Sequence, residues 1–227
     1  MKPWNKFRLP NFLVKHEPAI GLDIGTSLIK MVELEKKGNV LRLKKFALSP
    51  LAAGENSALW LKEFVKLNIP PGRPVNISLA GQAVIIRYIT WPKMTLNELK
   101  SALQFEAREY LPFPLEEMIL DCAIVKDNIE NNKMLIALAA IKKKAVEERL
   151  NLLEQAGLIA QTIDVDCFCL ANAFNNSYSA PSSPLKPETI ALLNVGAHST
   201  NMVILQDGLL RFSRDIAFGG LEVTRVN

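Results

Sequence analysis

An internal repeat constrains the fold of this 227-residue chain more than any other feature of its sequence. The pattern of residues 20–34 returns over residues 191–205. Each copy predicts a buried strand, a tight turn at a glycine and a second strand, and a further glycine then leads into a third strand. Two copies of one three-stranded meander predict a duplicated fold with a cleft between its halves. The matched positions include Asp23 with Asn194, Gly25 with Gly196, and Met31 with Met202.

The segment between the two copies predicts a β-α-β-β-α block over residues 81–161. Thr95 and Glu98 have the spacing of a capping box, which opens a helix that runs to about Tyr110. A second helix is expected to stop at Gly157. The expected elements are helices over 55–67, 95–110, 142–156 and 167–174, and strands over 75–80, 84–89, 119–126, 133–141 and 163–165.

These elements predict an α/β fold built from mixed sheets. The inserted block separates two pieces of one core, and the second copy of the meander opens a second lobe. The expected parts are a basic N-terminal tail (1–18), a first core (19–80 and 162–180), an inserted subdomain (81–161), and the opening meander of an incomplete second lobe (188–227), which a linker rich in Asn, Ser and Pro (175–187) precedes.

The composition argues against several classes of protein. Apolar residues make up 49% of the chain, which is enough for one or two packed cores. The net charge of +4 is spread over mixed clusters without a basic stripe interleaved with aromatic residues, so nucleic acid is not an expected partner. No apolar run approaches the ~20 residues that span a bilayer. The N-terminal tail mixes aromatic and basic residues, which fits a frayed end or a weak contact with a membrane surface or a partner.

The cysteines and histidines predict no disulfide and no metal site. An odd number of cysteines without a CxxC pair favours a reducing compartment, and all three are expected to be core thiols. No cluster of histidines accompanies them. The three cysteines are Cys122, Cys167 and Cys169.

The first glycine turn has the composition of a phosphate-binding turn. Gly25 lets the backbone approach a ligand closely, so that neighbouring N–H groups can converge on a phosphate. Thr26 and Ser27 add hydroxyl donors. Asp23 is placed to hold a metal through water beside the phosphates, and Lys30 on the return strand can neutralise phosphate charge. An ordinary hairpin turn is the competing interpretation, and the recurrence of the pattern favours the phosphate site.

The second turn keeps the glycine but has an asparagine where the first turn has Asp23. Gly196 is retained, and Ser199 and Thr200 follow it as candidate phosphate donors. Asn194 stands at the acidic position, and a neutral amide can orient water but cannot balance metal charge or take a proton. The turn therefore favours nucleotide binding without efficient turnover. His198 is either a surface turn residue or a phosphate contact, and the backbone of Gly219 and Gly220 is expected near the same cleft.

Two such turns on repeated meanders, with an insertion in the first half, resemble the actin, Hsp70 and hexokinase superfamily and its ribonuclease H-like fold. Four stretches narrow the resemblance to the PilM family of type IV pilus assembly. Residues 104–117 are similar to its E-x-x-x-Y-(I/L)-P-(F/Y)-P-L-E-E signature, and residues 21–34 to its opening phosphate motif. Residues 163–174 and 218–224 match two further blocks.

The resemblance implies an actin-like scaffold that binds ATP and Mg²⁺ and has at most weak ATPase activity. It further implies a place in the pilus assembly platform, at the cytoplasmic face of the bacterial inner membrane. PilM-like proteins capture the N-terminal peptide of the inner-membrane protein PilN in a groove between the first core and the insert. The residues that this places at the groove are Leu103, Ala107, Tyr110, Leu111 and Phe113.

The sequence departs from the family in two ways. Asn194 replaces the usual aspartate, which puts hydrolysis in doubt, and most of the second lobe of the family, with its adenosine-binding segment, does not follow the final meander. An apolar face of that meander is therefore expected to be exposed and to favour self-association. Leu103, Ala107 and Leu111 also fit the core face of their own helix.

Two other functions remain open at this point. A phosphotransferase such as a sugar kinase needs a carboxylate base beside a substrate pocket, and Asp164 and Asp166 are the acids nearest the insert. Asp166 is, however, expected to cap the helix that follows it. A nucleotide-free scaffold, like the cytoplasmic domain of the type II secretion protein GspL, is favoured by Asn194 and disfavoured by the intact first turn.

Overall fold

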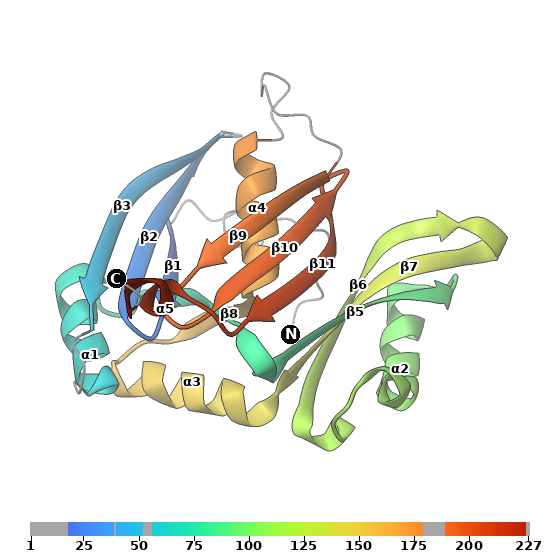
Figure 1. Cartoon of the computed structure of the whole chain (residues 1–227), viewed down its shortest axis with the longest axis horizontal. Coiled ribbons are helices and arrows are strands. Elements are labelled where there is room, and N and C mark those ends of the chain that lie inside the picture. The colour runs from blue at the N-terminus through green and yellow to red at the C-terminus, as the bar shows by residue number, and fades with distance from the viewer. Residues whose placement is uncertain (1–17, 39, 52–55, 179–188, 226–227) are drawn as a thin grey trace.

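The computed structural model describes residues 18–38, 40–51, 56–178 and 189–225. The chain forms three sheets, one of five strands and two of three strands (Figure 1). The insert lies to one side of the other two sheets, and helix α4 (Asp166–Tyr178) stands between the five-stranded sheet and the final meander. The N-terminal tail and most of the expected linker lie outside the described residues.

The five-stranded sheet has the order β3-β2-β1-β4-β8. Its first three strands form an antiparallel meander, and β4 and β8 add in parallel to β1. Apolar residues of β1 and β2 alternate toward a core that α1 (Ser57–Asn68) and the end of α3 (Lys143–Gln155) cover. The strands are β1 (Ala19–Ile24), β2 (Leu28–Lys37), β3 (Val40–Pro50), β4 (Val75–Leu79) and β8 (Ala160–Val165).

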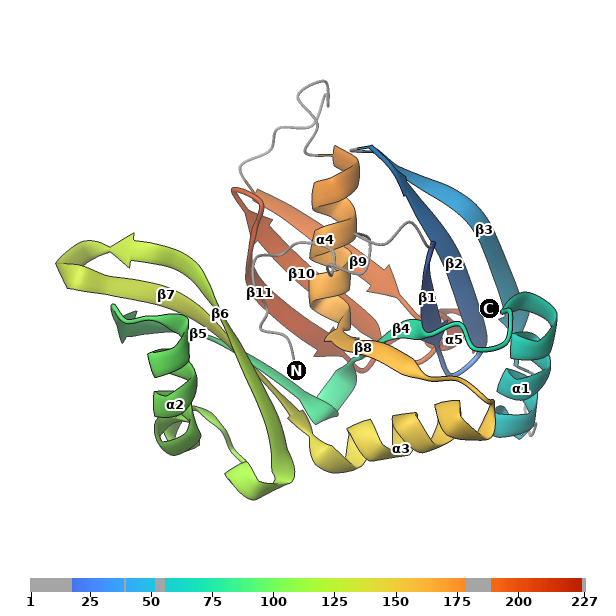
Figure 2. The same cartoon turned by 180° about the vertical axis from the view of Figure 1, so that it is seen from behind.

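The insert is a three-stranded antiparallel sheet of order β5-β7-β6 with α2 (Leu96–Glu106) on one face. Figure 2 shows α2 beneath this sheet and α3 running from its end toward α1. Leu99 and Leu103 of α2 pack against Met134, Ile136 and Leu138 of the central strand. The strands are β5 (Val84–Pro92), β6 (Met118–Ile129) and β7 (Lys133–Lys142).

The final meander has the order β11-β10-β9 and one face packed on α4. Val203, Leu205 and Leu210 are almost fully buried against Phe168 and Ala171 of that helix. The strands are β9 (Thr189–Val195), β10 (Thr200–Gln206) and β11 (Leu209–Ile216), and α5 (Gly220–Arg225) follows. The order of strands and turns therefore repeats that of β1, β2 and β3, as the sequence predicts.

The local signals of the sequence place most element ends correctly. Thr95 and Glu98 form both bonds of the capping box at the start of α2. Gly157 adopts φ +74° after α3, and its neighbour Leu158 donates to the Leu153 carbonyl at 2.9 Å, which closes the helix end. The helix expected to reach Tyr110 ends instead at Glu106. The chain tightens into a 3₁₀ turn over Ala107–Tyr110 ahead of Pro112.

Helix α3 is attached to the insert in sequence but packs on the first core. Leu153 and Leu158, at and just after its end, lie with Ile20 and Leu22 of β1, whereas α2 packs only within the insert. The sequence-based division groups α3 with the insert. From this packing we propose that the inserted unit ends with β7, at Lys142.

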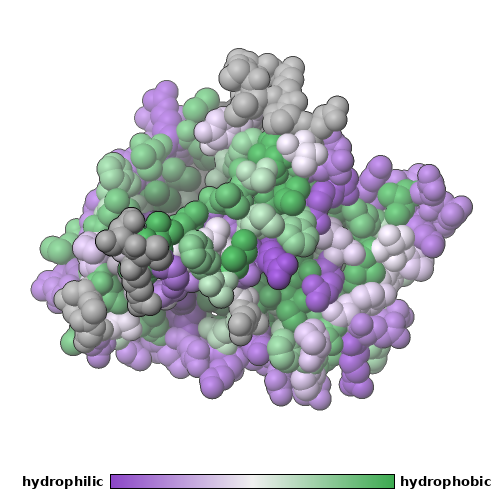
Figure 3. Space-filling model, viewed as in Figure 1, coloured by the Kyte–Doolittle hydropathy of each residue, from purple (hydrophilic) through white to green (hydrophobic). Residues whose placement is uncertain are grey.

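The outer face of the final meander exposes apolar side chains, as expected from the sequence. Leu193 and Val195 of β9 are 62% and 60% exposed, and Phe212 of β11 is 43% exposed. Figure 3 shows hydrophobic side chains gathered over β9 and β10 on this face. None of the described helices is long and apolar enough to span a bilayer.

Candidate functional site

The two glycine turns are built in the same way. The Gly25 N–H donates to the Leu28 carbonyl at 3.1 Å, and the Gly196 N–H donates to the Ser199 carbonyl at 2.8 Å. A Cβ at either glycine would come within 2.8 or 2.9 Å of that carbonyl oxygen. Each turn is therefore a tight loop that needs glycine at the same position, which confirms the repeat at the level of backbone geometry.

The first turn keeps its polar side chains open to solvent. Asp23 and Lys30 face one another across β1 and β2 and form an ion pair of 2.7 Å with both side chains about half exposed. Thr26 is exposed and Ser27 is half-buried, and neither hydroxyl bonds to another described residue. The Ser27 carbonyl accepts from the Leu51 N–H at 2.9 Å, which anchors the turn to the end of β3.

The second turn is closed by the start of α5. Gly220 and Leu221 donate their N–H groups to the carbonyls of Gly196 and Ala197 at 2.8 and 3.0 Å. The Gly219 N–H donates to the Glu222 carboxylate at 2.9 Å, and the Thr200 hydroxyl donates to the Phe218 carbonyl at 2.7 Å. The structure thus brings Gly219, Gly220 and Thr200 to the turn as expected. Their donors hold the turn itself together, and Ser199 and His198 remain exposed.

A chain of polar contacts runs from the second turn to the insert. The Asn194 amide donates to the Asn201 side-chain oxygen at 3.2 Å, and Asn201 donates in turn to the Asp215 carboxylate. The other oxygen of Asp215 accepts from the Gly81 N–H at 2.6 Å. Asn194 is therefore engaged by a neighbouring amide, and Asp215 ties the final meander to the first residue of the insert.

Asp166 lies between the two turns. It is the first residue of α4, and a hydrogen bond from the Ser78 side chain acts to lower the pKa of its carboxyl. The expected N-cap role of Asp166 stays a prediction. Burial raises the pKa of Asp166, and the negative charges of Asp23 and Asp215 raise it further. Charges from β1 and from β11 therefore act on one acidic group. Only its position directly after the strand could have suggested this from the sequence.

Arg149 supplies a half-buried positive charge next to the first turn. Its guanidinium donates to the Ile24 carbonyl at 3.0 Å, directly before Gly25. Burial lowers the pKa of Arg149, and the charges of Asp166 and Asp23 act in the opposite direction. Arg149 ends the charged run of residues 142–149, and no local pattern in the sequence distinguishes it from its exposed neighbours.

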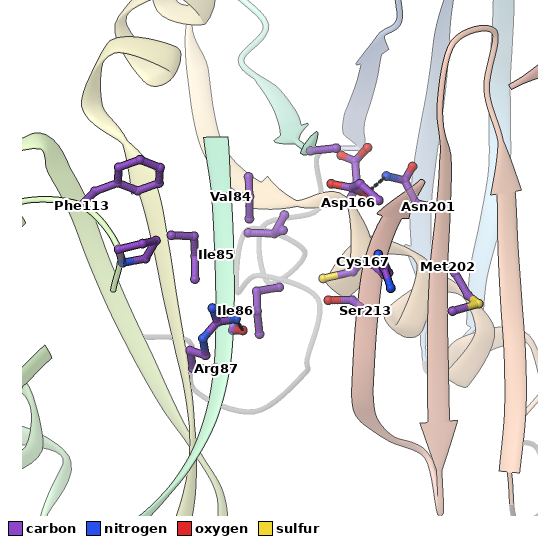
Figure 4. Close-up of a pocket in the computed structure, with 15 residues that line it drawn as sticks. Val84, Ile85, Ile86, Arg87, Phe113, Asp166, Cys167, Asn201, Met202 and Ser213 are labelled. Carbon is purple, nitrogen blue, oxygen red and sulfur yellow. Dashed lines mark hydrogen bonds between the residues drawn. The ribbon is translucent and has the colours of Figure 1, made fainter. Parts of the chain in front are cut away.

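A cavity of about 260 Å³ lies between the insert, the start of α4 and β11 (Figure 4). Its wall on the insert side is mostly apolar, and the opposite wall includes the polar side chains of Asp166, Asn201 and Asp215. The residues that line it on the insert are Val84, Ile85, Ile86, Arg87, Pro112 and Phe113.

The five residues expected at a partner groove divide into two groups. Leu103, Ala107 and Leu111 are buried in the core of the insert and offer almost no surface to a partner. Tyr110 and Phe113 are partly buried, and Phe113 reaches the cavity while the Lys142 ammonium lies 3.9 Å from its ring centroid. Of the expected set, Phe113 is the residue that the structure places in a cavity.

The cysteines and potential metal ligands complete the comparison with the sequence. Cys122 and Cys167 are buried as expected, and burial raises their thiol pKa values to about 11 and about 12. Cys169 is exposed, so the expectation of a core thiol is wrong there. Within the described residues, no three His, Cys, Asp or Glu side chains converge as a metal site.

Replacing Gly219 with alanine should destabilise the fold. A Cβ at Gly219 would lie 2.5 Å from the Ala197 carbonyl oxygen, and overpacking of this kind costs about 1–3 kcal/mol. Gly220→Ala is the matched control, because its Cβ would meet the Gly196 oxygen at an ordinary 3.6 Å. Urea unfolding of both variants measures the difference. Equal stability of the two variants would contradict the close packing of α5 on the second turn.

Replacing Asp166 with asparagine should stabilise the fold at alkaline pH. The pKa of Asp166 is raised in the folded state, so the folded chain holds this proton more tightly than the unfolded chain does. The carboxyl therefore costs stability above its folded pKa, and the cost vanishes below its unfolded pKa of about 4. The melting temperature of Asp166→Asn should exceed that of the parent at pH 8, and the gain should disappear near pH 4. The exposed Asp127→Asn variant should show no such trend.

Comparison with known proteins gives both the fold and the family. A family model described as type IV pilus assembly protein PilM matches residues 21–226. A chain of a PilM–PilN type IV pilus biogenesis complex is 29% identical with a TM-score of 0.74, and the match covers 92% of this chain and 64% of that one. This chain thus spans slightly less than two thirds of the length of that relative.

Two more distant structures share the fold. A Bacteroides thetaiotaomicron protein with an actin-like ATPase fold and unknown function is 11% identical with a TM-score of 0.51, and the match covers 96% of this chain and 76% of that one. The cytoplasmic domain of EpsL, an inner membrane component of the type II secretion system of Vibrio cholerae, is also 11% identical. Its TM-score is 0.55, with 88% of this chain and 71% of that one covered. The chain has an actin-like α/β fold and belongs to the PilM family of type IV pilus assembly proteins.

Proposed function

We propose that this protein is an ATP-binding scaffold of type IV pilus assembly that captures a PilN-like partner. The observation that supports the nucleotide site is the pair of matched glycine turns. The charge of Asp23, at the first turn, also acts on Asp166. Two phosphate turns on either side of one cleft are the arrangement that the resemblance to the actin superfamily implies. Because the match covers only 64% of the relative in the PilM–PilN complex, nucleotide binding and partner capture are proposed for this chain.

The donor set of the first turn fits a phosphate chain with Mg²⁺. Thr26 and Ser27 offer hydroxyls that bond to no other described residue, and Lys30 offers a positive charge that Asp23 now neutralises. Mg²⁺ keeps most of its water ligands in such sites, so Asp23 would hold the ion through water. Arg149, fixed to the Ile24 carbonyl, adds positive potential behind the turn.

The second turn favours binding over hydrolysis. Asn194 cannot accept a proton, and its amide is engaged with Asn201. Thr200, Gly219 and Gly220 use their donors within the turn, so Ser199 and the backbone around it remain as candidate phosphate contacts. Asp166 is an acid placed between the turns, and burial raises its pKa.

Isothermal titration of the chain with ATP and Mg²⁺ tests this site. Lys30→Met should weaken binding at least about tenfold, because it removes the positive charge beside the phosphates. Lys44→Met is the matched control, since Lys44 pairs with Glu33 on the neighbouring strand. No heat with the parent chain, or an equal loss in both variants, would remove the first turn from the site.

A nucleotide-free scaffold is the second candidate. It is favoured by Asn194 and by the internal bonding of the second turn, which leaves few donors for a ligand. The same titration separates the two functions, because this candidate predicts no nucleotide binding together with intact capture of the partner.

The groove for the partner is placed at the cavity between the insert and the rest of the chain. Apolar residues of β5 and Phe113 form one wall, which suits an extended apolar peptide such as the N-terminal segment of a PilN-like protein. The contact of the Lys142 ammonium with the Phe113 ring holds the loop at Pro112 and Phe113 against the end of β7. Binding of an inner-membrane partner would bring the protein to the cytoplasmic face of that membrane.

Phe113→Ala should weaken capture of the PilN N-terminal peptide by about tenfold or more, since it removes an aromatic wall of the cavity. Fluorescence anisotropy with a labelled peptide measures the affinity. Phe105→Ala is the matched control, because Phe105 lies on α2 with 79% of its surface exposed and does not line the cavity. Unchanged affinity of Phe113→Ala would exclude Phe113 from the groove.

A further inference from the structure

The cavity beside the insert follows the free edge of a strand. It is lined by four consecutive residues of β5, Val84 to Arg87. Successive side chains of a strand point to opposite faces of the sheet. Val84 and Ile86 indeed pack toward the α4 side, while Ile85 packs into the core of the insert (Figure 4). A cavity that contacts side chains on both faces of β5 must run along the edge of the strand, where the backbone is exposed.

Three observations show which backbone groups of β5 point out of the sheet. Within the part of the chain that the structure describes, strand β5 pairs with β7 alone and is an edge strand. The Lys93 N–H, which continues the same register, donates to the Asn132 carbonyl at 3.1 Å, so odd-numbered residues of β5 face β7. Pro92, which has no N–H, accordingly falls on an outward position. Ile86 therefore directs both its N–H and its carbonyl toward the cavity.

The outward carbonyl of Ile86 accepts a hydrogen bond from a side chain of the same strand. The Arg87 guanidinium donates to it at 3.1 Å. Edge strands that remain unpaired are commonly protected by charged side chains in this way. An incoming N–H could replace the guanidinium at this carbonyl, and would leave Arg87 free to donate to a carbonyl of the incoming segment.

The opposite wall of the cavity is a second free edge. Strand β11 is also an edge strand, and consecutive residues Ser213, Arg214 and Asp215 line the cavity. Asp215 accepts from the Gly81 N–H and closes one end of the space between the two strands. The cavity is thus a slot between two strand edges with apolar side chains on the β5 side, a shape that accepts an extended chain.

We propose that the partner peptide binds by adding a strand to the free edge of β5, through main-chain hydrogen bonds to Ile86. This rests on the proposed capture of a PilN-like peptide and specifies how that peptide is held. Affinity then comes from the peptide backbone, and selectivity comes from alternate side chains that meet Val84, Ile86 and Phe113 on one face or the other.

A set of N-methylated peptides tests the binding mode without altering the protein. Each peptide is the N-terminal PilN segment with one backbone N–H methylated in turn, titrated by fluorescence anisotropy. Strand addition predicts losses of at least about tenfold at alternate positions and little loss between them. Binding that tolerates every methyl group, or losses without period two, would overturn strand addition while leaving partner capture intact. No binding by the unmodified peptide would overturn both.

Two proline variants provide an independent measurement on the protein. Ile86→Pro removes an outward N–H that faces the cavity, and Thr90→Pro removes an outward N–H of the same edge beyond it. Peptide affinity should fall at least about tenfold in Ile86→Pro and stay unchanged in Thr90→Pro, with circular dichroism confirming that both variants fold. Equal affinities of the two folded variants would contradict the proposal.

Discussion

Helix α4 is the element on which the rest of this structure depends. The final meander has no core of its own, and its buried residues Val203, Leu205 and Leu210 pack against Phe168 and Ala171 of the helix. The same apolar cluster takes in Leu79 and Val165 of the first sheet. Burial of a side chain as large as Phe168 is worth several kcal/mol, and truncation of such a residue typically costs about 3–5 kcal/mol. The position of the second turn relative to the first therefore follows from one helix.

The same apolar cluster explains why polar groups gather above it. Asp166 begins α4, and the helix packs on β4 and β8 of the five-stranded sheet and on β10 and β11 of the final meander. The charges of Asp23, Asp215 and Arg149 then act on one another through a partly buried space, where electrostatic interactions are stronger than in water. The candidate site is thus a by-product of packing the five-stranded sheet and the final meander on a shared helix.

Much of the fold was predictable from the sequence because its signals are local. The two glycine turns, the capping box at Thr95 and the stop at Gly157 each depend on residues a few positions apart, and all of them are present in the structure. The residues of the first turn were predictable for the same reason. The early end of α2 was not predicted, since the choice between α-helix and 3₁₀ turn ahead of Pro112 is a small energetic difference.

The parts that were missed depend on contacts between distant segments. Arg149 reaches Ile24 across 125 positions of sequence, and Asp215 reaches Gly81 across 134. No sequence pattern within a single helix or strand predicts such a contact. The burial of Leu103 and Ala107 was visible in the spacing of α2, which fits a core face as well as a binding face, and only the packing of the insert decides between them.

Helix α3 also sets the mechanics of the molecule. It continues from β7 without a loop, and it spans about 20 Å at 1.5 Å per residue. At its start, Lys142 and Lys143 hold the loop at Phe113 and Glu116, and two turns later Arg149 holds the last residue before the first turn. A helix is stiff along its axis, so it acts as a strut between these two places. The insert therefore cannot swing without pulling on the first glycine turn.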